Sequence, residues 1–144
     1  MSLFNWVLES GSILLLRKKL MIPANDYWHH HYVFEKLSPF REKMIGIEMC
    51  NNIIINSIIP LLYTYGKIIP DPFILNKAVS WLEQIPAEHN RVIEGWKRTG
   101  ISVKKASGSQ ALTELKKQFC DQRRCLECEI GKQILHPVEM QGSI

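Results

Sequence analysis

The sequence predicts an all-α protein: a single compact bundle of about five or six helices with a central, largely buried helix. Three observations carry this prediction. Apolar residues recur at helical spacing over a long stretch in the middle of the chain. Residues that cap or stop helices separate that stretch from its neighbours. A length of 144 residues suits one compact domain, which can bury about two-thirds of the surface of the unfolded chain.

The N-terminal part of the chain is predicted to contain a poorly defined segment followed by a helix. Residues 1–25 form a poorly defined N-terminal segment, in which apolar residues and Gly11 indicate only a broken helix. Asn25 or Asp26 can cap a helix that begins near Tyr27. That helix would continue past Tyr32 and end at Ser38-Pro39, because the residue before a proline disfavours helical geometry. A helical domain is therefore expected over residues 26–135.

The central helix is predicted between Glu42 and Tyr65, where apolar residues continue for too long to be a strand. Pro60 has no N–H and should kink this helix, and Gly66 is placed to stop it. Three asparagines lie in the same stretch, and any that is buried must be hydrogen-bonded. They are Asn51, Asn52 and Asn56.

Three further helices follow. Asp71-Pro72 opens one that runs to Ile85, with Asp as the cap and Pro at the first helical position. A short helix spans residues 87–99. Ser107 and Gln110 resemble a capping box for a helix that ends near Cys120. The polar residues 136–144 are expected to form a loose tail.

Composition and charge exclude several classes of protein. The chain is 46% hydrophobic and 22% charged, which is ordinary for a globular protein. No apolar run approaches the ~20 residues of a membrane span, and no signal peptide is recognisable, so a cytoplasmic location without membrane contact is expected. The net charge of +4 is uneven, since the segment from Lys97 to Lys132 carries nine basic and four acidic residues, or +5. Such a basic end can attract nucleic acid or can simply be a solvated helix face.

A cysteine triplet is the densest chemical signal in the chain. Cys120, Cys125 and Cys128 follow the spacing C-x4-C-x2-C, which can place thiolates around one metal ion or cluster. A fourth ligand is required, and the sequence offers Cys50, His136 and the run His29-His30-His31. The basic neighbours Lys116, Lys117, Arg123 and Arg124 favour thiolate and are the candidate phosphate contacts.

Several interpretations of the triplet stay open at this point. The thiols can be reduced structural residues, they can hold zinc or, with less support, an iron–sulfur cluster, or they can form a thiol redox sensor. No arrangement of residues indicates a catalytic site.

Several sequence elements resemble a known family. They are Asp26-Tyr27-Trp28 with His31-Tyr32, the stretch IIINSIIPLLYTYG, Ser109-Gln110-Ala111-Leu112 and CDQRRCLECEIG. Together they resemble the C-terminal part of the bacterial proteins called domain of unknown function 2851, over about residues 26–135, whereas residues 1–25 match poorly. The resemblance implies no activity. It implies that members are longer proteins with a large N-terminal region, and it favours His31 over Cys50 as the fourth ligand of the triplet.

The sequence therefore indicates a non-catalytic structural or interaction module, the C-terminal portion of a larger protein, whose partner is another protein or a missing N-terminal domain. The alternatives are a nucleic-acid-binding accessory domain with a zinc or iron–sulfur element, and a thiol redox sensor.

Overall fold

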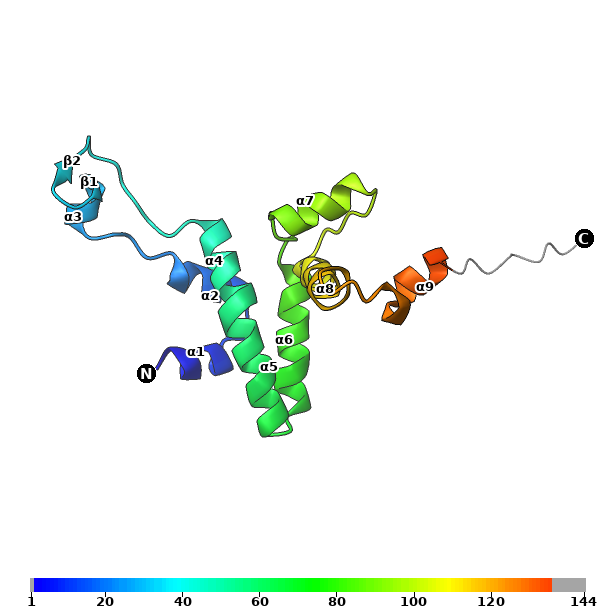
Figure 1. Cartoon of the computed structure of the whole chain (residues 1–144). Helices are drawn as coiled ribbons and strands as arrows, with labels where there is room; N and C mark the ends of the chain where they lie inside the picture. The colour runs from blue at the N-terminus through cyan, green and yellow to red at the C-terminus, as the bar shows by residue number, and fades with distance from the viewer. Residues whose placement is uncertain (1, 136–144) are drawn as a thin grey trace, which may run out of the picture. The chain divides into compact units, whose positions relative to one another are not determined.

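A computed structural model describes residues 2–135, and these residues confirm the all-α class (Figure 1). The only sheet in this part of the chain has two short strands. The tail predicted at residues 136–144 lies outside the described residues. Where the sequence suggested one bundle, the chain divides into two compact units, Met1–Ile85 and Pro86–Ile144.

Unit 1 contains six α-helices, a π-helical segment and the two strands within its described residues. The elements are α1 (Leu3–Glu9), α2 (Ile13–Leu20), α3 (Asp26–His29), β1 (His31–Val33), β2 (Lys36–Leu37), α4 (Ile47–Ile53), η1 (Ile54–Ile58), α5 (Ile59–Ile68) and α6 (Pro72–Gln84). Residues 1–25, which the sequence left undefined, thus form two helices. Ser2 and Ser12 cap them, each with its side chain accepting from a backbone N–H.

The predicted central helix is present as the unbroken succession of α4, η1 and α5, from Ile47 to Ile68. Its start lies later than Glu42, with Gly46 as the N-cap. Pro60 is accommodated by the π-helical segment directly before it, in which the Ile59 N–H donates to the Ile54 carbonyl, five residues back. Local π geometry is one of the ways in which a helix absorbs an irregularity such as a proline.

The core of unit 1 forms around one side of this helix. The most buried apolar side chains come from all of its longer helices: Val7, Ile13, Leu16, Leu20, Cys50, Ile54, Ile55, Ile58, Ile59, Leu62, Ala78, Trp81 and Ile85. Of the three asparagines, Asn51 accepts a hydrogen bond of 2.8 Å from Arg17 Nε, and Asn52 and Asn56 are exposed. Because Leu61 and Ile68 are also exposed, the central helix is buried along one face instead of on most sides.

Lys77 attaches α1 to α6. Its Nζ donates to the carbonyls of Val7 (2.9 Å) and Leu8 (2.8 Å), which are among the last carbonyls of α1 and have no partner inside the helix. The ammonium group also lies 4.9 Å from the centre of the Trp81 ring. Burial lowers the pKa of Lys77 from its ordinary value.

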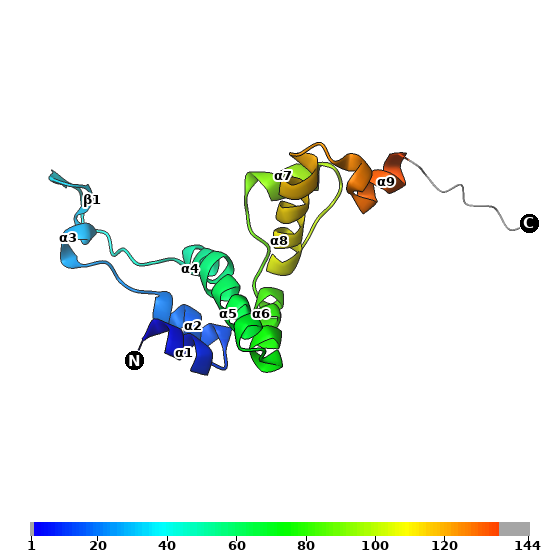
Figure 2. The ribbon, with the colours of Figure 1, turned by 60° about the horizontal axis from the view of Figure 1, so that its bottom comes forward.

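Helices α5 and α6 lie side by side as an antiparallel pair (Figures 1 and 2). The predicted start of α6 is confirmed, since Asp71 accepts from the N–H groups of Phe73 and Ile74 and Pro72 is the first helical residue. The prediction for Gly66 was wrong, because α5 continues to Ile68. Gly66 is instead buried against α6, where an added Cβ would lie 3.0 Å from a Leu75 methyl carbon.

The helix predicted from Tyr27 towards Leu37 was also wrong. Only Asp26–His29 is helical, capped by Asn25 as expected, and the chain then turns into the hairpin of β1 and β2. Glu35 occupies the left-handed region (φ 62°) in the turn, which a continuous helix excludes. The Tyr27 hydroxyl accepts from the Glu35 N–H at 3.0 Å, so a tertiary contact supports the turn where local spacing suggested a helix.

Unit 2 contains α7 (Arg91–Arg98), α8 (Ala106–Leu115), the π-helical η2 (Lys116–Cys120), the 3-10 turn η3 (Cys125–Glu127) and α9 (Glu129–Leu135). Trp96 Nε1 donates to the Leu112 carbonyl at 3.2 Å and ties α7 to α8. The capping box was misplaced, since Lys105 is the N-cap of α8 and Gln110 donates to Glu88 Oε2 instead.

The close packing at Gly66 leads to a testable prediction. Replacing Gly66 by Val should destabilise the protein by about 1–3 kcal/mol, because the added methyl groups enter the Leu75 and Ile74 side chains. The control is Gly95→Val in α7, where an added Cβ meets nothing within 4 Å, and a change below about 0.5 kcal/mol is expected. Urea unfolding followed by circular dichroism measures both. Equal stability of the two variants would contradict this role of Gly66.

Candidate functional site

The structure places the three cysteines of the triplet in one short part of unit 2. Cys120 is the last residue of η2, as predicted, and Cys125 opens η3. Both are exposed, whereas Cys128, between η3 and α9, is buried at 7% exposure. All three are free thiols in the described structure.

The metal ligands predicted within residues 2–135 are not gathered into a cluster. Among residues 2–135, no three His, Cys, Asp or Glu side chains lie close enough together to hold a metal ion. Cys50 is fully buried in α4 of unit 1, and His31 lies at the start of β1 in the same unit. His136 lies outside the described residues. The zinc or iron–sulfur site therefore stays a prediction.

The segment around the triplet is closely packed at one point. An added Cβ on Gly131 would lie 2.2 Å from the Cys125 carbonyl oxygen, far inside normal contact distance. The Lys132 N–H donates to the Cys128 carbonyl at 2.8 Å and continues the backbone into α9. Glycine at position 131 thus allows α9 to lie against η3.

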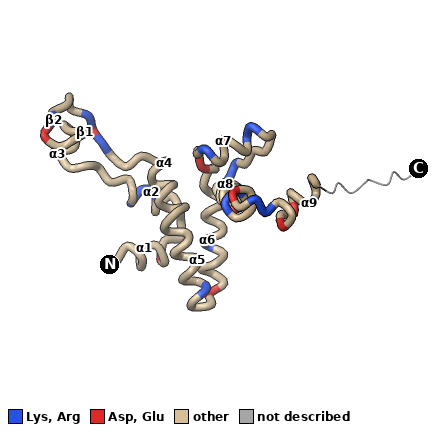
Figure 3. The backbone as a smooth tube through the Cα atoms, in the orientation of Figure 1, with Lys and Arg blue, Asp and Glu red and all other residues tan. Residues whose placement is uncertain are grey.

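The candidate phosphate contacts are partly engaged by carboxylates. Lys116 forms an ion pair with Asp121, and Arg124 forms one with Glu127 through two of its nitrogens. The hydrogen bond from Arg124 lowers the pKa of the Glu127 carboxyl. Lys117 and Arg123 form no ion pair with any described residue. Figure 3 shows the resulting mixture of basic and acidic positions between α8 and α9.

A different feature, which the sequence analysis missed, is a long excursion between α2 and α4. We call residues 22–45 the arm; it contains α3, β1 and β2. Many of its large apolar side chains are exposed, including Phe34 at 75% and Leu37 at 78%. The others are Ile22, Tyr27, Tyr32, Val33, Phe40 and Met44. Eight of the 25 large apolar side chains that are exposed among residues 2–135 lie in these 24 residues, and such a group typically marks an interaction surface.

Contacts between rings organise the distal part of the arm. The Tyr27 and His31 rings stack with centroids 3.9 Å apart, and Trp28 meets Phe34 edge to face at 5.0 Å. Lys43 Nζ donates to the His31 carbonyl at 2.6 Å and lies 3.5 Å from the centre of the Tyr32 ring. These contacts hold the hairpin together while the outer faces of its rings stay exposed.

The His29-His30-His31 run belongs to this arm. His29 Nδ1 accepts from the Lys43 N–H at 3.0 Å, and His31 Nδ1 lies 2.7 Å from the Tyr27 carbonyl. The ring of His30 packs near Phe40, with centroids 5.3 Å apart. Each of the three side chains therefore has a packing or hydrogen-bonding role.

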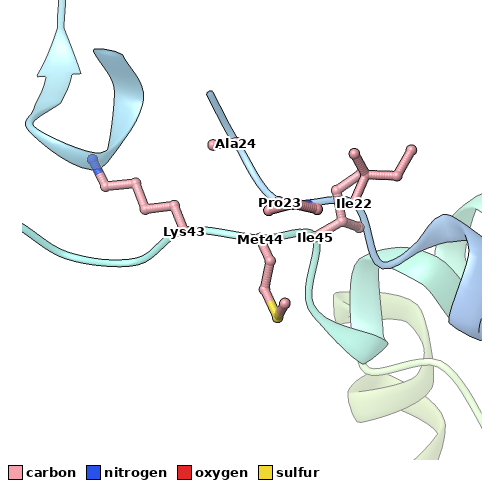
Figure 4. Close-up of a pocket in the computed structure, with 6 residues that line it drawn as sticks. All are labelled: Ile22, Pro23, Ala24, Lys43, Met44 and Ile45. Atoms are coloured by element: carbon pink, nitrogen blue, oxygen red, sulfur yellow. The ribbon is translucent and has the colours of Figure 1, made fainter. Parts of the chain in front are cut away.

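The two limbs of the arm pair at its base, which we call the neck (residues 22–24 and 43–45). The Ala24 N–H donates to the Lys43 carbonyl at 2.8 Å, and the Ile45 N–H donates to the Ile22 carbonyl at 3.1 Å. Between these bonds, Pro23 and Met44 form an isolated antiparallel bridge. A cavity of about 350 Å³, lined by the six neck residues, opens there (Figure 4).

The close contact between Gly131 and Cys125 can be tested by substitution. Gly131→Ala should displace α9 from η3, because the new methyl group overlaps the Cys125 carbonyl. Hydrogen exchange at the Lys132 amide should become faster, whereas the nearby Gln133→Ala should leave it unchanged. Unaltered exchange in Gly131→Ala would contradict the close contact.

The metal hypothesis is tested by elemental analysis of protein purified without chelator. Zinc bound at the triplet predicts about one equivalent per chain, which Cys125→Ser should remove. A content below about 0.2 equivalents of any transition metal in the unaltered protein would exclude the site.

Comparison with known proteins identifies a family. No match is found among curated proteins, and none is found among solved structures. The family model described as "Protein of unknown function (DUF2851)" matches residues 1–91. This range includes residues 1–25, which were expected to match poorly, and the whole arm, and it ends before the cysteine triplet. Because the match covers more than half of the sequence, the chain belongs to this family of proteins of unknown function.

Proposed function

We propose that this chain is a non-catalytic interaction module that binds a protein partner, or a further domain of a larger protein, through the arm. The observation that carries the proposal is the exposure of the arm's apolar side chains. Tyr32, Phe34 and Phe40 are each more than 60% exposed, and they occupy a single excursion from unit 1.

A partner can bury the exposed surface of these rings, and that burial would contribute to the free energy of binding. An aromatic side chain carries about 150–250 Å² of surface, so these three rings offer on the order of 400 Å² to a partner. A standard interface buries about 800 Å² on each side, and the remaining apolar residues of the arm can supply much of the difference. A two-stranded hairpin is also only marginally stable by itself in water, so contact with a partner would stabilise the arm.

The alternatives have less support. Two of the four candidate phosphate contacts, Lys116 and Arg124, already pair with carboxylates, and binding to nucleic acid would have to compete with those pairs. A redox sensor remains a proposal that rests on the exposed thiols of Cys120 and Cys125. The redox alternative gives the exposed apolar surface of the arm no role, and the nucleic-acid alternative uses only its aromatic rings.

Site-specific photo-crosslinking tests the proposal. A photoreactive phenylalanine analogue at Phe34 should form a discrete crosslinked species in cells that express the protein natively. The same analogue at Glu94, exposed on α7, is the control and should not form that species. The combined substitution of Tyr32 and Leu37 by Ser should weaken the crosslink from position 34, because it removes apolar contact area.

Absence of any specific crosslink at Phe34 would refute the proposal. Crosslinks of equal yield and identity at Glu94 would also do so, since they would show proximity without a defined surface.

A further inference from the structure

We propose that the neck of the arm receives an extended, acidic segment of the protein partner, which adds as a β-strand along the Met44 edge and inserts an apolar side chain into the neck cavity. This inference rests on the proposed function and specifies how the partner is recognised. In this binding mode the main-chain hydrogen bonds supply affinity and a side-chain pocket supplies specificity.

The hydrogen bonds of the neck define its open edge. The bonds from Ala24 to Lys43 and from Ile45 to Ile22 flank the bridge between Pro23 and Met44. In such an antiparallel pair the two bridged residues direct their own N–H and C=O groups away from each other. No described residue forms a hydrogen bond with the N–H or C=O of Met44. Both groups are therefore available to a third strand.

The opposite edge cannot accept a strand equally well. Pro23 has no N–H, so an added strand would find only its carbonyl there. Proline on an edge strand is a common way to prevent pairing. The neck therefore has one blocked edge and one open edge, so a strand can add only on the Met44 side.

The cavity lies at the same place. The residues that line it are those of the neck, and all of them except Lys43 have apolar side chains. In Figure 4 the Lys43 side chain points from the neck towards the hairpin, so its ammonium group is remote from the Ile22 end. The cavity, of about 350 Å³, is shallow and largely open to solvent, and its mostly apolar lining suits a Leu, Met or Phe side chain laid against it.

The net charge near the neck indicates which residues the bound segment should carry on either side of its apolar side chain. Residues 17–29 and 38–50, which extend five positions on each side of both limbs of the neck, contain five cations and three carboxylates, a net charge of +2. The cations are Arg17, Lys18, Lys19, Arg41 and Lys43, of which Lys43 is directed towards the hairpin, and the carboxylates are Asp26, Glu42 and Glu48. Complementarity therefore favours Asp or Glu beside the apolar anchor and increases the association rate.

These observations favour a peptide over nucleic acid as the occupant. A nucleic acid would use the cations and the exposed rings, but it has no donor and acceptor pair that continues a β-ladder. The open Met44 edge and the apolar cavity together match an extended polypeptide.

Selection from a library of random ten-residue peptides displayed on phage tests the inference, with the whole chain as the target. Enriched peptides should combine an apolar anchor with acidic neighbours. Their affinity, measured by fluorescence anisotropy of synthetic copies, should fall about tenfold or more in Met44→Pro, which removes the N–H of the open edge. Met44→Leu keeps that N–H and is the matched control, with affinity expected to be unchanged.

A second variant tests the inference independently, in case Met44→Pro does not fold. Ala24→Leu adds bulk to the cavity without removing any backbone donor, and it should weaken the same peptides by a similar factor. Failure to enrich any peptide would overturn the inference, as would peptides that bind both variants with unaltered affinity. Salt-dependent binding of a single-stranded oligonucleotide at the neck, in place of peptides, would overturn it too. If the crosslink at Phe34 persists in any of these cases, only the inference about the neck fails and the proposed function stands.

Discussion

Burial of one face of the helix from Ile47 to Ile68 is the constraint on which the rest of unit 1 depends. This face supplies Ile54, Ile58 and Leu62 to the core, and α1, α2 and α6 each bury their own apolar residues together with it. A face of isoleucine and leucine exposed to water would cost about 25 cal/mol for each Å². Helices as short as α1 and α2 are unstable alone in water, so they owe their stability to this packing.

Two positions in this long helix, Pro60 and Gly66, would be expected to interrupt it, yet both fit its packing. Pro60 cannot donate a backbone hydrogen bond, and the π-helical segment before it keeps the chain helical through the proline. Gly66 removes a side chain where α5 meets Leu75 of α6, so the two helices can approach closely. Both residues are usually associated with the end of a helix. Here the helix continues past both because tertiary packing outweighs their local preference.

The arm has the opposite character. It leaves apolar side chains in solvent that a core would normally take up, and it interrupts a unit whose other elements are helices. Its rings organise one another through stacking and edge-to-face contacts, as between Tyr27 and His31. The candidate site therefore rests on a segment whose own packing leaves much of its apolar surface exposed, which is the arrangement expected where a partner supplies the missing contacts.

The sequence by itself determined the helical class, the central helix, the Asp71-Pro72 start of α6 and the position of Cys120 at a helix end. These features depend on local signals, namely apolar periodicity and capping residues, which act within a few positions along the chain. Only the tertiary structure decided that Asp26–His29 is followed by a hairpin, that Gly66 packs instead of stopping a helix, and that residues 22–45 expose their aromatic rings. Each of these depends on residues that are distant along the chain, such as Lys43 with His31 and Gly66 with Leu75. Helical spacing cannot reveal such contacts, because it records which residues share a face and not what that face meets.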